Sequence, residues 1–189
     1  ANFNYYNNVA YILVTNTGFN SPSSSGNTDN WYASGGTYNS PIYNTYNDAI
    51  SALNEEDIPC YTITSSQFNK SEYSDISRQT LASWYEISTA NYSDIFRPIA
   101  ASICTKYGGC PAKTDIVFLL DSTTTMVSSL TSLYNNMNYF ARQLSGKCVD
   151  YKFGGITFGN NYGITHIPIQ GSPIPLDQPR SFIAPTELG

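Results

Sequence analysis

The chain has 189 residues, a length that suits one domain, or one and a fraction, with a sizeable buried core. Only 12% of the residues are charged, and 14 acidic against 9 basic side chains give a net charge of −5. A surface of this kind does not neutralise phosphates, so we expect no nucleic-acid partner.

Short apolar strands and helical stretches alternate in the first part of the chain. In order these are a strand at 9–15, a polar loop at 19–44, a helix at 45–56, a strand at 58–64, and helices at 74–85 and 94–105. Ile76, Leu81 and Trp84 define the apolar side of the second helix, and Ser93 is a suitable N-cap for the third.

A connector, 106–113, precedes the second part of the chain, which contains the clearest helix. The elements are a strand at 115–120, a helix at 126–144, two strands at 149–158 and 162–169 that favour a hairpin, and a tail at 171–189 with four prolines. Six apolar residues recur along that helix at steps of three and four: Met126, Leu130, Leu133, Met137, Phe140 and Leu144. The alternation predicts an α/β sandwich with a mainly parallel sheet, helices on both faces and one antiparallel edge strand.

Four cysteines and two glycosylation triplets indicate an extracellular protein. The cysteines lack the paired spacing of metal ligands, so they favour two disulfides. Cys110 and Cys148 each precede one of two neighbouring strands, which suggests that they pair with each other and leaves Cys60 with Cys104. This is one of three possible pairings. Asn69 and Asn91 each begin an N-x-S/T triplet, which predicts N-linked glycans. We expect no membrane span, because no apolar run approaches the required length of about 18 to 20 residues.

The stretch DIVFLLDSTTTM, residues 115 to 126, carries the candidate binding site. Asp121, Thr123 and Thr125 place one carboxylate and two hydroxyls directly after a buried strand, where ligands of parallel sheets bind. Hard cations such as Mg²⁺ prefer oxygen ligands of this kind. The alternative is structural, since Thr123 or Thr125 would equally suit the N-cap of the following helix.

This stretch, its helix and VDYKFGGITFG together resemble the first half of a von Willebrand factor type A (vWA) domain, whose adhesion site begins with an Asp-x-Ser-x-Ser motif. Earlier segments resemble the second half: NVAYILVTNTGF is similar to its fourth strand, AISALNEEDIPCYTITSSQF to the next helix and strand, and LASWYEISTANYSDIFRPIAASIC to its closing strand and helix. The resemblance implies a Rossmann-like three-layer sandwich. Its halves are permuted, with the second half at 7–104 and the first half at 114–170.

The permuted order divides the chain into a second-half segment at 1–105, the connector at 106–113, a first-half segment at 114–170 and the tail at 171–189. Three arrangements would explain the order. The chain is a circular permutant, a piece of a tandem array cut within its repeats, or a molecule whose halves complement those of its neighbours in a fibre. We expect either one composite domain or two half-domains shared with neighbours.

The resemblance also predicts a degenerate metal site. Asn16 stands where the family has its second metal-site aspartate, so an oxygen remains but a charge is lost. Thr186 is a poor match for the loop threonine of the family. No cofactor is therefore required, and Mg²⁺ or Ca²⁺ is the ion that Asp121, Thr123, Thr125 and Asn16 would hold.

Catalysis has little support in the sequence. His166 lies in a strand-like run with no serine or cysteine motif to pair with it, and Gly35 and Gly36 belong to no phosphate-binding fingerprint. The acidic run at 55–57 lacks the spacing of a calcium loop. We therefore expect no enzyme.

The residues and the resemblance together predict a secreted structural or adhesive glycoprotein. It would act through protein–protein contact with copies of itself or with tandem neighbours, and assemble into an extracellular filament or matrix. The alternative function is a metal-ion-dependent cell-adhesion domain that binds a partner carboxylate through Mg²⁺.

Overall fold

The computed structural model describes residues 8–16, 46–65, 70–87, 91–107, 112–146, 149–158 and 165–170. Their elements are β1 (Asn8–Thr15), α1 (Tyr46–Glu55), β2 (Cys60–Thr64), α2 (Lys70–Gln79), β3 (Trp84–Glu86), α3 (Tyr92–Tyr107), β4 (Ala112–Asp121), a short 3₁₀ turn (Thr124–Met126), α4 (Val127–Ser145), β5 (Val149–Phe158) and β6 (Thr165–Gln170). None of the helices in these ranges is long and apolar enough to cross a bilayer.

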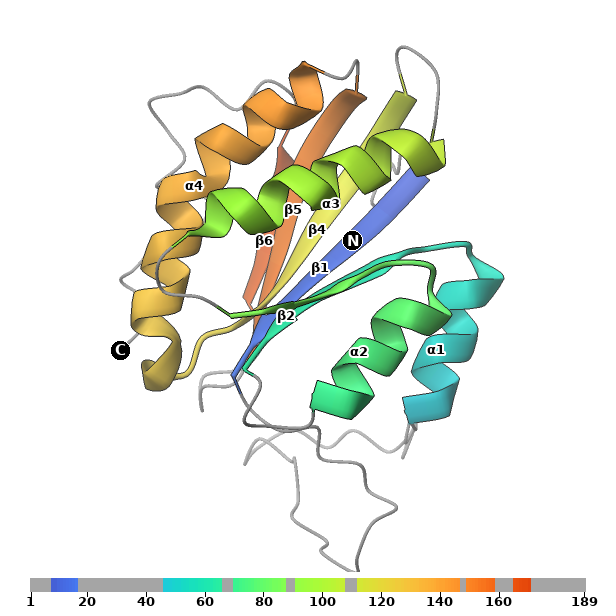
Figure 1. The fold of residues 1–189 in the computed structure, drawn as a ribbon, viewed down its shortest axis with the longest axis horizontal. Coiled ribbons are helices and arrows are strands. Elements are labelled where there is room, and N and C mark those ends of the chain that lie inside the picture. Colours follow the sequence, from blue (N-terminus) through green and yellow to red (C-terminus); the bar gives the residue numbers. More distant parts are fainter. Residues whose placement is uncertain are drawn as a thin grey trace, which may run out of the picture.

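The strands form one six-stranded sheet in the order β3-β2-β1-β4-β5-β6 (Figure 1). The first five strands are mutually parallel, and β6 pairs with β5 in the antiparallel direction. The predicted mainly parallel sheet with one antiparallel edge strand is therefore confirmed. At its centre β1 pairs with β4, from Asn8 opposite Thr114 to Val14 opposite Leu120, so the two predicted half-segments meet inside one sheet.

Helices cover both faces of the sheet, as predicted (Figure 1). Alternate side chains of each central strand point to opposite faces because a strand has a period of two. On one face, Ile12 and Phe118 pack with the buried sides of α3 and α4 in the main core. Its centre is aromatic: Phe140 stacks on Phe96 at 4.6 Å and on Phe153 at 5.7 Å between ring centroids.

The other face carries a smaller core under α1 and α2. It consists of Ile50, Cys60, Tyr73 and Ile76, with Tyr11, Leu13, Leu53 and Trp84 packed against it. Cys104 belongs to α3 and packs against the main core on the opposite face. The predicted Cys60–Cys104 disulfide is therefore wrong for this structure, because the sheet lies between the two sulfur atoms and no disulfide joins them.

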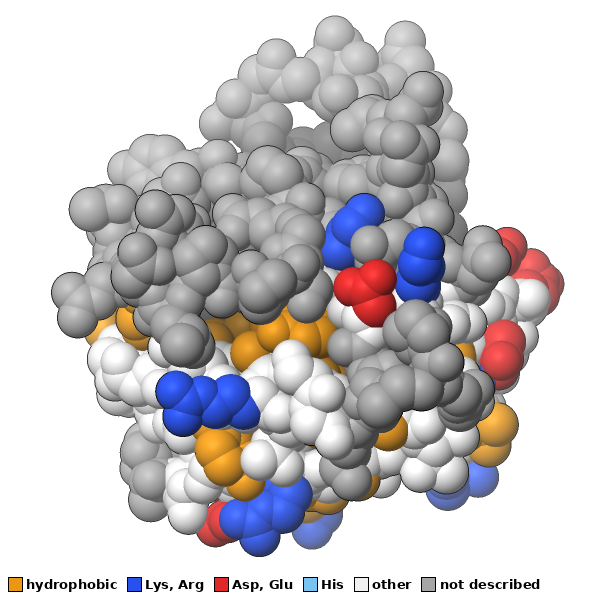
Figure 2. All heavy atoms as spheres, turned by 90° about the horizontal axis from the view of Figure 1, so that it is seen from above, with side chains coloured by type: hydrophobic (Ala, Val, Ile, Leu, Met, Phe, Trp, Pro, Cys, Tyr) orange, Lys and Arg blue, Asp and Glu red, His pale blue; other side chains and the backbone are white. Residues whose placement is uncertain are grey.

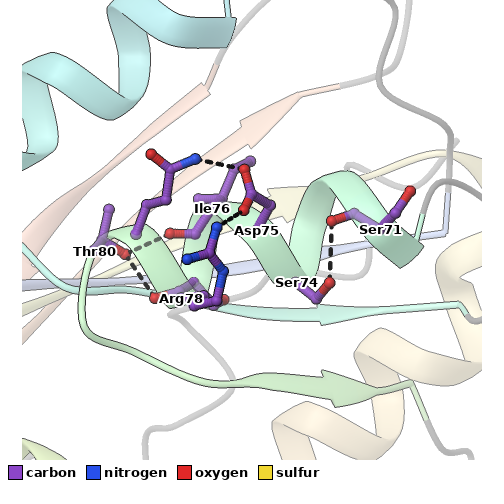
Figure 3. Close-up of polar contacts among 8 residues, drawn as sticks. Ser71, Ser74, Asp75, Ile76, Arg78 and Thr80 are labelled. Atoms are coloured by element: carbon purple, nitrogen blue, oxygen red, sulfur yellow. Dashed lines mark hydrogen bonds and ion pairs between the residues drawn. The ribbon is translucent and has the colours of Figure 1, made fainter.

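The predicted helix at 74–85 is wrong at both ends, because α2 begins at Lys70 and ends at Gln79. Thr80 closes it by donating its hydroxyl to the carbonyls of Ile76 and Ser77 (Figure 3). Leu81 then adopts a φ of 57°, which reverses the chain. Trp84, expected on the helix, instead begins β3.

The helix predicted at 94–105 is longer and has a different start. α3 begins at Tyr92, so Ser93 lies inside its first turn and cannot be the N-cap. Asn91 precedes the helix, its carbonyl accepts from the Asp94 amide, and its side-chain oxygen accepts from the Ser93 hydroxyl. Asn91 thus occupies the N-cap position.

Candidate functional site

The carboxyl ends of β1 and β4 lie side by side and present a cluster of oxygen atoms. Asp121, at the end of β4, is fully buried. One of its carboxylate oxygens accepts a 2.7 Å hydrogen bond from the Thr15 hydroxyl of β1, and the other accepts from the Thr123 amide at 3.0 Å. The carboxylate is therefore fixed from both sides by protein donors.

The two threonines after β4 connect this carboxylate to the end of β1. The hydroxyls of Thr123 and Thr125 lie 3.1 Å apart, and Thr125 donates to the Asn16 side-chain carbonyl at 3.3 Å. Asp121, Thr123, Thr125 and Asn16, which the sequence analysis predicted as one site, are thus brought together in the structure. We call these four residues the oxygen cluster.

Neither threonine caps α4, which was the structural alternative, although Thr123 stands at the N-cap position of the 3₁₀ turn. The 3₁₀ turn and α4 both begin without a side-chain capping hydrogen bond, and the residue at the N-cap of α4 is Met126. Ser122 instead secures the loop by donating its amide and hydroxyl to the Phe158 carbonyl of β5. The Thr125 hydroxyl is therefore available to donate to Asn16, and the Thr123 hydroxyl to contact that of Thr125.

Sequence reasoning missed two residues that support the cluster, Thr15 and Tyr73. Thr15 directly precedes Asn16 in a strand, and because side chains alternate, its hydroxyl points to the face on which Asp121 lies. Tyr73 of α2 is buried close enough to Thr15 for a hydrogen bond. Burial raises the pKa of Tyr73 to about 12, and the charges of Asp121 and Glu72 act in the same direction. Its phenol is therefore neutral, and it links helix α2 to the cluster.

The neighbouring strand end on β2 is polar in the same way but uncharged. The Thr64 hydroxyl accepts a 2.7 Å hydrogen bond from the Trp84 indole, and the Lys70 ammonium lies 4.5 Å from the centre of the Trp84 ring. A cation over an aromatic face gains electrostatic attraction. Thr64, Trp84 and Lys70 thus contact one another at the end of β2 beside the cluster.

The oxygen spacing of the cluster suits a small hard cation. Octahedral Mg²⁺ holds its ligands at about 2.1 Å, which places adjacent oxygens about 3.0 Å apart. The separations of 3.1 Å between Thr123 and Thr125 and 3.3 Å between Thr125 and Asn16 are close to that value. The negative charge of the cluster is low, however, because Asp121 is its single carboxylate. The described residues contain no group of three or more His, Cys, Asp or Glu side chains that would hold a metal.

The structure describes only some of the remaining predicted site residues. Cys110 and Cys148 lie outside the described residues, although Ala112 and Val149 beside them are paired in register. Asn69 also lies outside that part of the chain. Asn91 is exposed at the start of α3, where its amide donates to Asp94 at 2.6 Å.

Two further positions considered in the sequence are also located. The backbone of His166 pairs with Ile156 in β6, one strand beyond β5 and three strand positions from β1. The acidic run at 55–57 is exposed at the end of α1. Asp57 there pairs with the Lys106 ammonium of α3 at 2.6 Å, so part of this run is engaged in an ion pair.

Comparisons with known proteins indicate the fold alone. No protein-family model and no curated protein sequence matches the chain. A solved structure, that of an uncharacterized protein from Alicyclobacillus acidocaldarius subsp. acidocaldarius DSM 446, is similar with a TM-score of 0.56 and 9% sequence identity. The similarity covers 86% of this chain and 79% of that one.

Proposed function

We propose that this chain is a non-catalytic module of an extracellular adhesive or structural assembly, and that it binds protein through the carboxyl-end edge of its sheet. The observation that carries the proposal is the oxygen cluster, in which a buried carboxylate is fully held by the protein itself. A buried charge that is hydrogen-bonded on both oxygens forms a rigid structural element. In this proposal the cluster has a structural role.

The surface around this edge suits contact with another protein. Thr124, Thr125 and Val127 are exposed at the rim of the edge, and none of them carries a charge. Figure 2 looks onto the opposite side of the molecule, at the amino ends of the strands, where the described charged side chains are scattered among hydrophobic and uncharged groups. Depletion of charge favours the central part of a protein–protein interface.

The sheet topology supports assembly from whole modules. The segments that resemble the two halves of a vWA domain pair through β1 and β4, over seven residues of each strand. One chain can therefore supply both halves of the sheet. We propose that contacts between neighbours join complete modules, in an array or a filament, and that the permuted order lies within each module.

Sedimentation velocity across a wide range of protein concentration tests this function. We expect the weight-average sedimentation coefficient to rise with concentration, and to rise equally with and without a chelator such as EDTA. A chain that stays monomeric up to millimolar concentration, and that also fails to bind to the extracellular matrix of its source, contradicts the proposal.

The spacing of the oxygen atoms favours one second candidate, a metal-ion-dependent adhesion domain. Thr123, Thr125 and Asn16 would contribute neutral oxygens and Asp121 the charge, and the ion would attract a carboxylate from the partner. Binding requires the carboxylate to give up part of its hold on Thr15 or on the Thr123 amide. We therefore expect weak affinity.

Calorimetry with Mg²⁺ and with Mn²⁺ separates the two candidates. The adhesion candidate requires binding at millimolar ion or below that disappears in Asp121→Asn and persists in Thr64→Val, which changes the neighbouring strand end. No heat of binding at millimolar Mg²⁺ and Mn²⁺ removes this candidate and leaves the ion-free contact module.

A further inference from the structure

The glycosylation triplet Asn91-Tyr92-Ser93 begins at an accessible atom in the structure. Asn91 is exposed, and its side-chain nitrogen, the atom that receives a glycan, donates to the Asp94 carboxylate at 2.6 Å. The Asp94 side chain is itself 65% exposed, so solvent reaches this pair. A large group attached to Asn91 would therefore extend outward without entering the core.

The other two residues of the triplet are held by the start of α3. Tyr92 is fully buried, and its ring packs on Phe96 with 5.6 Å between centroids. The Ser93 hydroxyl donates back to the side-chain oxygen of Asn91. A glycan-transferring enzyme has to hold the whole triplet, and it cannot do so while Tyr92 is in the core and Ser93 is bonded within the turn. The transfer must therefore precede the formation of α3.

The start of α3 lies well away from the carboxyl-end edge of the sheet. Phe96 stacks on Phe140 of α4, and the Arg97 guanidinium donates to the Tyr139 hydroxyl at 3.0 Å. Tyr139 is about 18 Å along α4 from Val127 at the rim of that edge, since a helix rises about 1.5 Å per residue. The first turns of α3 thus lie beside the middle of α4 (Figure 1).

Exposed polar groups continue from Asn91 across the outer surface of the two helices. Asp94 and Arg97 follow on α3 at steps of three residues, which keeps them on one side of the helix. Their charged groups lie 3.9 Å apart, and their side chains are 65% and 64% exposed. Tyr139 of α4 continues the row. A carboxylate, a guanidinium and a phenol are suitable hydrogen-bond partners for sugar hydroxyls.

We propose that Asn91 carries an N-linked glycan, which is added before α3 forms and shields the outer surface of α3 and α4. In the transfer, the asparagine nitrogen attacks the anomeric carbon of an oligosaccharide joined to a lipid pyrophosphate. The new C–N bond replaces the C–O bond, the lipid pyrophosphate leaves, and the nitrogen loses one proton. This inference rests on the proposed extracellular location, and it leaves the carboxyl-end edge clear for protein contact.

Site occupancy is tested with the full chain made in secretory cells. Asn91→Asp removes the acceptor nitrogen but keeps a residue that is favoured at an N-cap. Ser93→Ala breaks the triplet and leaves Asn91 in place, whereas Ser93→Thr keeps a complete triplet. Treatment with a glycosidase that converts glycosylated asparagine to aspartate, followed by peptide mass analysis, should detect the glycan in the wild type and in Ser93→Thr alone. A wild-type Asn91 without a glycan overturns the inference.

The order of events is tested with a reversible inhibitor of glycan transfer. Chains that fold in the secretory compartment while the inhibitor is present should keep an unmodified Asn91 after the inhibitor is removed. Addition of a glycan to these folded chains overturns the proposed order.

Hydroxyl-radical footprinting tests the shielding. Tyr139 should be oxidised several-fold more slowly in the glycosylated wild type than in Asn91→Asp. Tyr11, which packs in the core on the other face of the sheet, should react equally in both and is the internal control. Equal rates at Tyr139 overturn the shielding.

Sedimentation velocity of the same two proteins separates this inference from the proposed function. We expect the glycosylated wild type and Asn91→Asp to associate equally, because the glycan lies away from the contact edge. A glycosylated chain that never associates overturns the proposed self-assembly and leaves the glycan site. A chain that associates without a glycan at Asn91 overturns this inference alone, and a glycan that suppresses association overturns its assignment to a surface outside the contact.

Discussion

Replacing Thr15 with valine should destabilise the fold by removing a hydrogen bond to a buried charge. Thr15 and Asp121 are 1% and 0% exposed, and their side-chain oxygens lie 2.7 Å apart. Valine has nearly the same shape but no hydroxyl, so one carboxylate oxygen loses its hydrogen bond from Thr15 in a site that water does not reach. Hydrogen bonds to charged groups contribute about 1.5–3 kcal/mol, so we expect a loss of about 2–3 kcal/mol in the free energy of unfolding.

Thr64→Val is the matched control for this prediction. Thr64 is equally buried at the end of the adjacent strand β2, and its hydroxyl accepts from the Trp84 indole at 2.7 Å. That pair is uncharged, so its loss should cost about 1 kcal/mol. Thr15→Ser keeps the hydroxyl and removes one methyl group, and should likewise cost about 1 kcal/mol.

Urea unfolding followed by far-ultraviolet circular dichroism measures all three variants. The slope of the free energy against urea should stay constant, since the surface exposed on unfolding is unchanged. A Thr15→Val variant no less stable than Thr64→Val would refute the reasoning, because the buried carboxylate would then not depend on Thr15.

Three further predictions concern the cores. Burial raises the pKa of Tyr61 and Tyr73 to about 12 from an ordinary value of 10. The stability that these neutral phenols contribute should therefore be complete below pH 10 and lost as the pH rises from 10 to 12. The urea midpoint of unfolding should fall over that pH range, and it should fall less in Tyr61→Phe. Burial also raises the pKa of the Cys60 thiol to about 12, so iodoacetamide should modify it only on unfolding, and rapid labelling of the native chain would contradict its burial. Phe140→Ala should cost about 3–5 kcal/mol in urea unfolding, because it leaves a cavity between two stacked rings; a loss below 1 kcal/mol would show that the core refills.

The candidate site could be predicted from the sequence because it depends on a general property of parallel sheets. Asp121 and Asn16 each follow an apolar run, and the carboxyl ends of parallel strands lie at one edge. Thr15 carried a weaker signal, since its contact depends on which face of the strand it occupies. Tyr73 could not be found in this way, because its position depends on how α2 packs against the sheet.

The end of α2 could not be predicted because apolar spacing alone does not distinguish a helix from a turn followed by a strand. Leu81 was counted as part of an apolar helical face, but it is exposed in a turn, and Trp84 belongs to the sheet. The prediction of a disulfide between Cys60 and Cys104 failed for a related reason. Cys60 and Cys104 lie on opposite faces, and the face of a residue changes with a single step of strand register.

The central pairing of β1 with β4 has a consequence for how the chain reaches its native state. Thr15 and Asp121 are 106 positions apart in the sequence, so the middle of the sheet closes only after a very long loop has been ordered. High contact order slows folding, and until β4 arrives, one edge of β1 lacks its partner strand. An unpaired strand edge accepts a strand from any nearby chain. The same junction that completes the sheet in one molecule is thus the place where two molecules folding together would exchange their halves.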